Sequence, residues 1–166
     1  MIGRLAMAMG AALVACSCGG APKTNVRPGR PLPAPRVIPG ELDAKLVLGE
    51  MPARAQRLGA GPMSIVASGQ VSEGERIGAF VEVPSDVCLL AYARASTSIE
   101  DIDIAAFAEE GNPVAVDESP DPRPTLLVCP PHPDRVYVAL HVAAGEGLVA
   151  LASHLVSRDR AQEVAR

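Results

Sequence analysis

Five acidic side chains form the set in this chain that could bind a metal ion. They are Asp101, Asp103, Asp117, Glu118 and Asp121. The first two fall on one side of an alternating segment, and the other three follow the next such segment. Calcium takes about six to eight oxygen ligands, mainly from carboxylates and loop carbonyls. Calcium is therefore the candidate ion, although a solvated strand face followed by a polar loop explains the same residues and no EF-hand spacing is present.

The first residues have the pattern of a secretory signal. Arg4 precedes an apolar run from Leu5 to Ala15, which is too short for a membrane-spanning helix of about 20 residues. The run ends in Leu13-Val14-Ala15-Cys16, which resembles the lipobox of bacterial lipoproteins. An ordinary signal peptide cut near Cys18 is the alternative.

The lipobox resemblance implies a processed and lipidated protein. It implies cleavage before Cys16 and a diacylglyceryl thioether on that cysteine, usually with an N-acyl chain. Two or more acyl chains anchor a protein durably in a membrane. Ser17 follows the cysteine, and in enteric lipoproteins a residue other than Asp there favours the outer membrane. We therefore expect a cell-envelope protein whose membrane partner is reached through lipid on Cys16.

The remaining cysteines fit an exported protein. Cys88 and Cys129 each lie at an end of a predicted strand, and paired cysteines persist as disulfides in oxidising compartments. Their bridge would contribute roughly 4 kcal/mol in the chain-entropy model. A metal site is disfavoured because no Cys-x-x-Cys spacing occurs, and a catalytic thiol would need a partnered histidine. Cys18 is left as a free thiol, a second acylated cysteine or an intermolecular crosslink.

Motifs for catalysis are absent from the sequence. It contains no Gly-x-Ser-x-Gly, no His-Glu-x-x-His and no phosphate-binding loop. If Gly145 marks a final hairpin turn, His141 lies opposite about Ala150 and His154 lies near Tyr137, so the two histidines share no metal site. Surface or half-buried positions are expected for the histidines, and no catalytic residue is predicted.

Composition and charge limit the class of protein. About 150 residues remain after cleavage, enough for one domain. The chain is 48% hydrophobic but has only two Phe, two Tyr and no Trp, so Val, Leu, Ile and Ala must build the core. Residues 21–40 carry a net charge of +4 and residues 41–166 carry −9. This balance argues against a nucleic-acid partner, and the basic segment suits anionic lipids or a solvated linker.

The spacing of apolar residues predicts an antiparallel β-sandwich. Alternation of apolar and polar residues starts at Ser64 and recurs in about eight short segments separated by Gly, Pro and Asp. Such spacing is typical of sandwiches and jelly rolls. The predicted organisation is a signal peptide over 1–15, a Pro-rich lipid-anchored linker without regular structure over 16–40, a lead-in with a possible short helix over 41–63, the β-sandwich over 64–156 and a charged tail over 157–166.

Residues 64–152 resemble the bacterial pre-peptidase C-terminal domain. The resemblance rests on the turn from Gly69 to Gly74, the segments Phe80-Val81-Glu82-Val83 and Asp101-Ile102-Asp103-Ile104, the turn Gly111 to Ala115, and Tyr137-Val138 followed by a Gly145-Glu146-Gly147 hairpin. It implies a jelly-roll-like sandwich. Calcium ligands of that family cannot be matched here residue by residue, and the aromatics that often decorate its exposed faces are mostly missing.

The sequence thus predicts a non-enzymatic, lipid-anchored envelope protein that presents an accessory or binding domain. An envelope protein or a polysaccharide would be its partner, with no nucleic acid and no required cofactor. A calcium-dependent binding module is the first alternative. An enzyme with an unrecognised site is the second.

Overall fold

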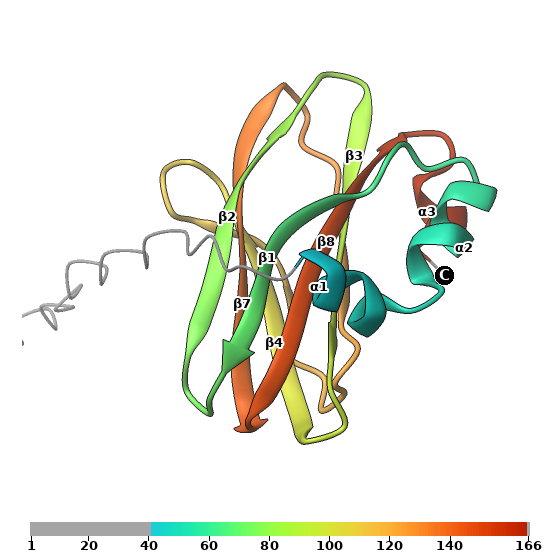
Figure 1. Ribbon diagram of the computed structural model, residues 1–166. Coiled ribbons are helices and arrows are strands. Elements are labelled where there is room, and N and C mark those ends of the chain that lie inside the picture. Colours follow the sequence, from blue (N-terminus) through green and yellow to red (C-terminus); the bar gives the residue numbers. More distant parts are fainter. Residues whose placement is uncertain (1–40, 166) are drawn as a thin grey trace, which may run out of the picture. The chain divides into compact units, whose positions relative to one another are not determined.

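A computed structural model describes residues 41–165 of the chain. The signal segment, Cys16, Cys18 and the linker to residue 40 lie outside the described residues. Eight strands and three short helices make up the described part (Figure 1). They are α1 Glu41–Leu48, α2 Met51–Arg57, β1 Ser64–Val71, β2 Arg76–Val83, β3 Val87–Ala95, β4 Ile99–Phe107, β5 Pro113–Asp117, β6 Thr125–Val128, β7 Asp134–Gly145, β8 Gly147–Ser157 and α3 Ala161–Val164.

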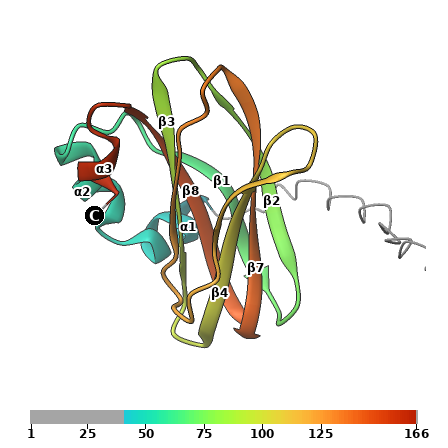
Figure 2. The ribbon, with the colours of Figure 1, turned by 180° about the vertical axis from the view of Figure 1, so that it is seen from behind.

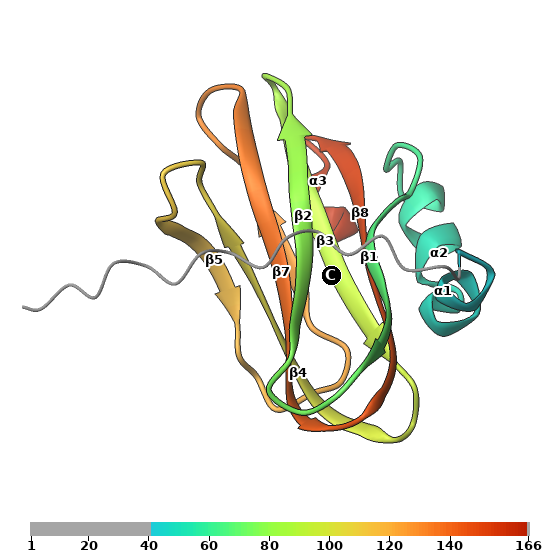
Figure 3. The same cartoon turned by 60° about the vertical axis from the view of Figure 1, so that its left-hand side comes forward.

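The strands form two antiparallel sheets that pack face to face. One sheet has the order β1-β8-β3-β6 and the other has the order β2-β7-β4-β5. Each sheet has four strands, and these two orders are those of a jelly roll. Figure 3 shows the two layers nearly edge-on. The prediction of an antiparallel β-sandwich with about eight strands is therefore confirmed.

Most connections cross from one sheet to the other. Only β4 and β5 are neighbours both along the chain and within a sheet. The predicted hairpin at Gly145-Glu146-Gly147 is wrong, because β7 and β8 belong to different sheets. A short glycine-rich connection suits a hairpin, but here it connects central strands of the two different sheets. The expected turn from Gly69 to Gly74 is also shifted, since Gly69 lies inside β1.

The core between the sheets is aliphatic, as composition predicted. Its largest fully buried members come from the central strands, and they include Leu89, Ile102, Ile104, Leu140 and Leu151. These side chains alternate along their strands with residues that face outward, which is the period-two pattern seen in the sequence. Neither Phe nor Tyr belongs to this core.

The helices cover only one face of the sandwich. Residues of all three helices pack on the outer side of the β1-β8-β3-β6 sheet, around Leu90, Tyr92 and Val156 (Figures 1 and 2). No described helix packs on the outer side of the other sheet. Among residues 41–165, no helix is both long and apolar enough to cross a membrane.

A disulfide joins Cys88 and Cys129. Cys88 is the second residue of β3, and Cys129 directly follows β6. The neighbouring pair Leu89 and Val128 is in register between these strands. The bridge therefore adds a covalent link next to the end of the β3–β6 pairing, and it holds the four-residue edge strand β6 in place.

Candidate binding face

The outer side of the β2-β7-β4-β5 sheet presents rows of side chains set by strand register. Directly opposite residues on neighbouring strands point to the same face. We call this surface the open face. Its outward-pointing rows are Phe80–Tyr137–Phe107, Gly78–Ala139–Ala105–Val116, Glu82–Arg135 and Arg76–His141–Asp103.

An aromatic row crosses three strands of the open face. Phe80 and Tyr137 meet edge to face with ring centroids 5.0 Å apart, and Phe107 pairs with Tyr137 from the other side. Tyr137 is only 1% exposed although it lies on an outer face, and burial raises the pKa of its hydroxyl. Three of the four aromatic side chains of the chain thus gather here, rather than in the core.

Exposed aliphatic side chains extend the aromatic row, and together they form what we call the apolar strip. Val114 and Val116 on β5 are 47% and 49% exposed, and Phe80 is 39% exposed. The only other large hydrophobic side chain this exposed in the described part is Leu46 on α1. Gly78, Ala139 and Ala105 lie between these groups, so the middle of the strip is flat.

Charged groups border the strip at one end. The guanidinium carbon of Arg135 lies 4.2 Å from the Phe80 ring centroid, in cation–π geometry. Arg135 also pairs with Glu82 at 3.3 Å and approaches Glu109 at 3.9 Å. A cleft of about 430 Å³ lies beside this cluster, where Pro84 and Pro133 form part of its wall.

A second polar group borders the opposite end. His141 Nδ1 lies 3.1 Å from Asp103 Oδ2 across the β4–β7 ladder, and Arg76 is opposite His141 on β2. The prediction that His141 lies opposite Ala150 is wrong, because Ala150 belongs to the other sheet.

The five acidic residues considered for calcium are not gathered at one place. Asp103 is on the open face, whereas Asp117 is opposite the buried Ile104 and so points to the inner side. Asp121 pairs with Arg123 at 3.4 Å, and Glu118 is exposed in the loop after β5. Residues 41–165 contain no group of three or more His, Cys, Asp or Glu side chains placed to hold a metal ion.

Asp101 lies at an irregularity that alternation could not reveal. The β4–β7 register shifts on both sides of Asp101, and such shifts change the way a side chain points. Its Oδ1 is buried and has no hydrogen-bond partner among the described residues.

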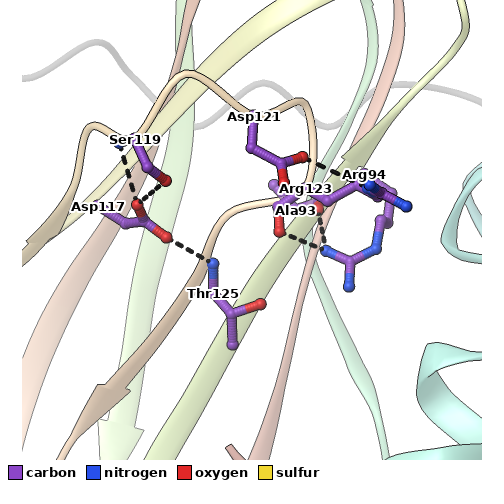
Figure 4. A network of polar contacts seen from close by, with 7 residues as sticks. All are labelled: Ala93, Arg94, Asp117, Ser119, Asp121, Arg123 and Thr125. Carbon is purple, nitrogen blue, oxygen red and sulfur yellow. Dashed lines mark hydrogen bonds and ion pairs between the residues drawn. The ribbon is translucent and has the colours of Figure 1, made fainter. Parts of the chain in front are cut away.

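Asp117 organises the loop between β5 and β6. Its Oδ1 accepts hydrogen bonds from the hydroxyl and the N–H of Ser119, at 2.5 and 3.2 Å, and its Oδ2 accepts one from the Thr125 N–H at 3.0 Å (Figure 4). Desolvation of the carboxylate opposes ionisation, but these hydrogen bonds outweigh it and lower the pKa of Asp117. The carboxylate therefore ties the loop to the start of β6.

Replacing Asp117 with Asn should weaken the domain in a pH-dependent way. A carboxyl whose pKa is lower in the folded state stabilises the protein above its unfolded pKa of about 3.9, and this contribution is lost as pH falls through the folded value. We expect a loss of about 1 kcal/mol near pH 7, since solvent screens a partly exposed carboxylate. Urea unfolding at pH 7 and pH 3 measures it. A deficit that persists undiminished at pH 3 contradicts the assignment, and Glu118→Gln is the matched control expected to have no effect.

The fourth aromatic residue lies beneath the helices with a buried histidine. His154 is 1% exposed, so the expectation of a surface or half-buried histidine is wrong there. Its Nδ1 lies 2.7 Å from the Gly61 carbonyl oxygen, which can only accept, and its Nε2 lies 3.1 Å from the Tyr92 hydroxyl. Burial raises the pKa of Tyr92 to about 12, with a smaller opposing effect of Arg94. The prediction that His154 lies near Tyr137 is also wrong, because it pairs with Leu90.

The aromatic row is the feature that sequence reasoning missed. The signal was present, because Phe80 falls out of phase with Ile77, Val81 and the other core residues of its segment. Tyr137 likewise alternates with the core residues Val136 and Val138. An apolar side chain at an outward position of a strand, such as Phe80, is the sequence pattern of a candidate interaction surface.

Comparison with known proteins does not assign this chain to a family. No family model matches the chain, and no curated protein matches it in sequence. Among solved structures, a periplasmic lysozyme inhibitor of g-type lysozyme from Aeromonas hydrophila is similar to it, with 11% identity and a TM-score of 0.41 over 58% of this chain and 88% of that chain. A likeness at this level carries no argument about ligand or partner.

Proposed function

We propose that this chain is a lipid-anchored envelope protein that binds a protein partner through the open face, without catalysis and without a cofactor. The observation that carries the proposal is the placement of Phe80, Tyr137 and Phe107 in one outward row. Burying an aromatic side chain removes a large apolar area from water. No Phe or Tyr lies in the core between the sheets, and Phe80 stays 39% exposed.

The composition of the open face fits a protein partner. Protein interfaces combine an apolar centre with a polar rim. The open face has such a centre in Phe80, Val114 and Val116, and charged groups of both signs border it. The other sheet has no comparable surface, because its outer side is already covered by the helices.

A polysaccharide fits this face less well. Sugar rings stack on aromatic rings that lie open to solvent. Tyr137 is 1% exposed, and the guanidinium of Arg135 lies over the Phe80 ring. The row therefore offers apolar contact and edges, rather than a platform for stacking.

The anchor is proposed from the sequence alone. The lipobox-like residues Leu13 to Cys16 support lipidation of Cys16, and the Ser17 position favours the outer membrane. Both lie outside the described residues. Intact mass spectrometry of the membrane fraction would test them, since a chain starting at Cys16 with added acyl mass is expected and an uncleaved chain contradicts the proposal.

Site-specific photocrosslinking tests the open face. Replacing Phe80 by p-benzoyl-phenylalanine in cells that produce the protein should give a discrete adduct with one protein. Adding Val114→Asp and Val116→Asp should lower its yield at least tenfold, because two exposed apolar contacts would become charged. Thermal unfolding of the variant should be nearly unchanged, since both side chains are about half exposed.

The matched control is Leu46→Asp. It makes the same apolar-to-acid change at a residue that is 75% exposed on α1, and it should leave the adduct yield unchanged. Equal losses in the control and the double variant, or no adduct at all, would overturn the proposal. An adduct with carbohydrate instead of protein would overturn the proposed protein partner and indicate a polysaccharide ligand.

A further inference from the structure

Four arginines converge on one cleft at the helix-covered side of the sandwich. Arg54 and Arg57 come from α2, Arg94 from β3, and Arg123 from the loop before β6. The cleft has a volume of about 300 Å³. Only one acidic residue, Glu50, lines it. We call it the arginine cleft. Its charge is unexpected in a chain whose net charge is −4.

The local structure holds Arg94 in a fixed position. Its Nη1 donates to the carbonyl oxygens of Ala93 at 2.6 Å and Arg123 at 3.1 Å (Figure 4). The Ala93 N–H in turn donates to the Pro124 carbonyl oxygen at 3.1 Å. The Asp117 contacts fix the loop on its other side. A guanidinium held in this way loses little further freedom when it binds a ligand.

Positive charge in the arginine cleft is not balanced by the described residues. Asp121 pairs with Arg123, but neither Arg54 nor Arg57 forms an ion pair with any residue between 41 and 165. Burial lowers the pKa of Arg94, and the nearby charge of Arg123 lowers it further. Like charges brought this close disfavour one another, so an anion bound among them would relieve that cost.

We infer that the arginine cleft binds a phosphomonoester carried on a small organic body. Guanidinium groups present paired N–H donors that match the oxygens of phosphate. The four arginines and the two nearby acidic residues, Glu50 and Asp121, have a net charge of +2, which a dianionic phosphate would neutralise. Leu48 and Met51 also line the cleft. Leu48 is buried, whereas the partly exposed Met51 offers apolar contact to the body that carries the phosphate. The inference is independent of the open face, which lies on the other sheet.

Isothermal titration of the full chain with inorganic phosphate and with glycerol 3-phosphate tests the inference at constant ionic strength. Saturable binding of glycerol 3-phosphate is expected, and the Arg54→Gln/Arg57→Gln variant should bind it at least tenfold more weakly. Both side chains are exposed, and removing like charges should leave the unliganded Tm unchanged or raised. A loss of binding in this variant would therefore not reflect unfolding.

The control variant is Arg76→Gln/Arg160→Gln. It removes the same charge from exposed positions outside the cleft, and it should retain binding. A parallel arm measures sedimentation with vesicles that contain phosphatidic acid. If the protein binds these vesicles and only the Arg54→Gln/Arg57→Gln variant loses that binding, the result supports the inference and identifies a lipid headgroup as the source of the phosphomonoester. Absence of binding in every arm, or equal loss in the control, would overturn it.

Discussion

Removing the Cys88–Cys129 bridge should lower the free energy of unfolding by roughly 4 kcal/mol. The bridge closes a loop with a sequence separation of 41, and the chain-entropy model gives about this value for such a loop. The loss would be a large share of the 5–15 kcal/mol that stabilises a typical domain. This loss of unfolding free energy should be especially important here, because the core between the sheets is made of aliphatic side chains without aromatic ones.

The structure also indicates which segment should unfold first when the disulfide is removed. Strand β6 has only four residues and lies at a sheet edge, where it pairs with β3 alone. Without the covalent link, β6 and the loop organised by Asp117 should detach first. Urea unfolding of Cys88→Ala/Cys129→Ala, together with hydrogen exchange of residues 125–128, would measure both effects. Cys18→Ser is the control, since that cysteine is outside the bridge. A loss below about 1 kcal/mol would contradict the prediction.

Gly145→Ala should lower the free energy of unfolding by roughly 2–5 kcal/mol. Gly145 ends β7 with φ at +93°, a conformation that costs a residue with a Cβ about 1–2 kcal/mol. An added Cβ would also lie 2.5 Å from the Ser98 carbonyl oxygen and 2.9 Å from the Ile99 Cα. Both contacts are with backbone, so relief requires the start of β4 to move, which adds about 1–3 kcal/mol.

Gly111→Ala separates these two contributions. Gly111 has a similar φ of +86°, but nothing lies within 4 Å of the added Cβ. This variant should therefore lose only the conformational contribution of about 1–2 kcal/mol. Thermal and urea unfolding of both variants gives the comparison. If Gly145→Ala loses no more stability than Gly111→Ala, the close approach of the β4 backbone is not what requires glycine.

The sequence was sufficient for the class of fold because most strands bury at least one face. Core residues such as Ile77, Val138 and Leu140 recur at every second position, so alternation located the strands. It could not assign their partners. The connection Gly145-Glu146-Gly147 is equally short whether it closes a hairpin or arches between sheets, and only the packing of distant strands decides between them.

The candidate sites were harder to predict for related reasons. Alternation placed Asp101 and Asp103 together, but shifts in register around Asp101 break the pattern. Asp117 points inward because its partner is Ile104, which sequence spacing does not reveal. The arginine cleft draws side chains from α2, β3 and a loop, up to 69 positions apart in numbering, such as Arg54 and Arg123. No local pattern marks such a group.

The strand order has a consequence for how the protein is made. The last two strands, β7 and β8, are central strands in their sheets, and β8 separates β1 from β3. A nascent chain whose residues 134–157 are still inside the ribosome lacks one of the two central strands of each sheet. In such a chain only β3 and β6, and β4 and β5, can form their native pairs. Strands β1 and β2 have no native neighbour to pair with. The complete order of both sheets can therefore form only after residues 134–157 have been synthesised.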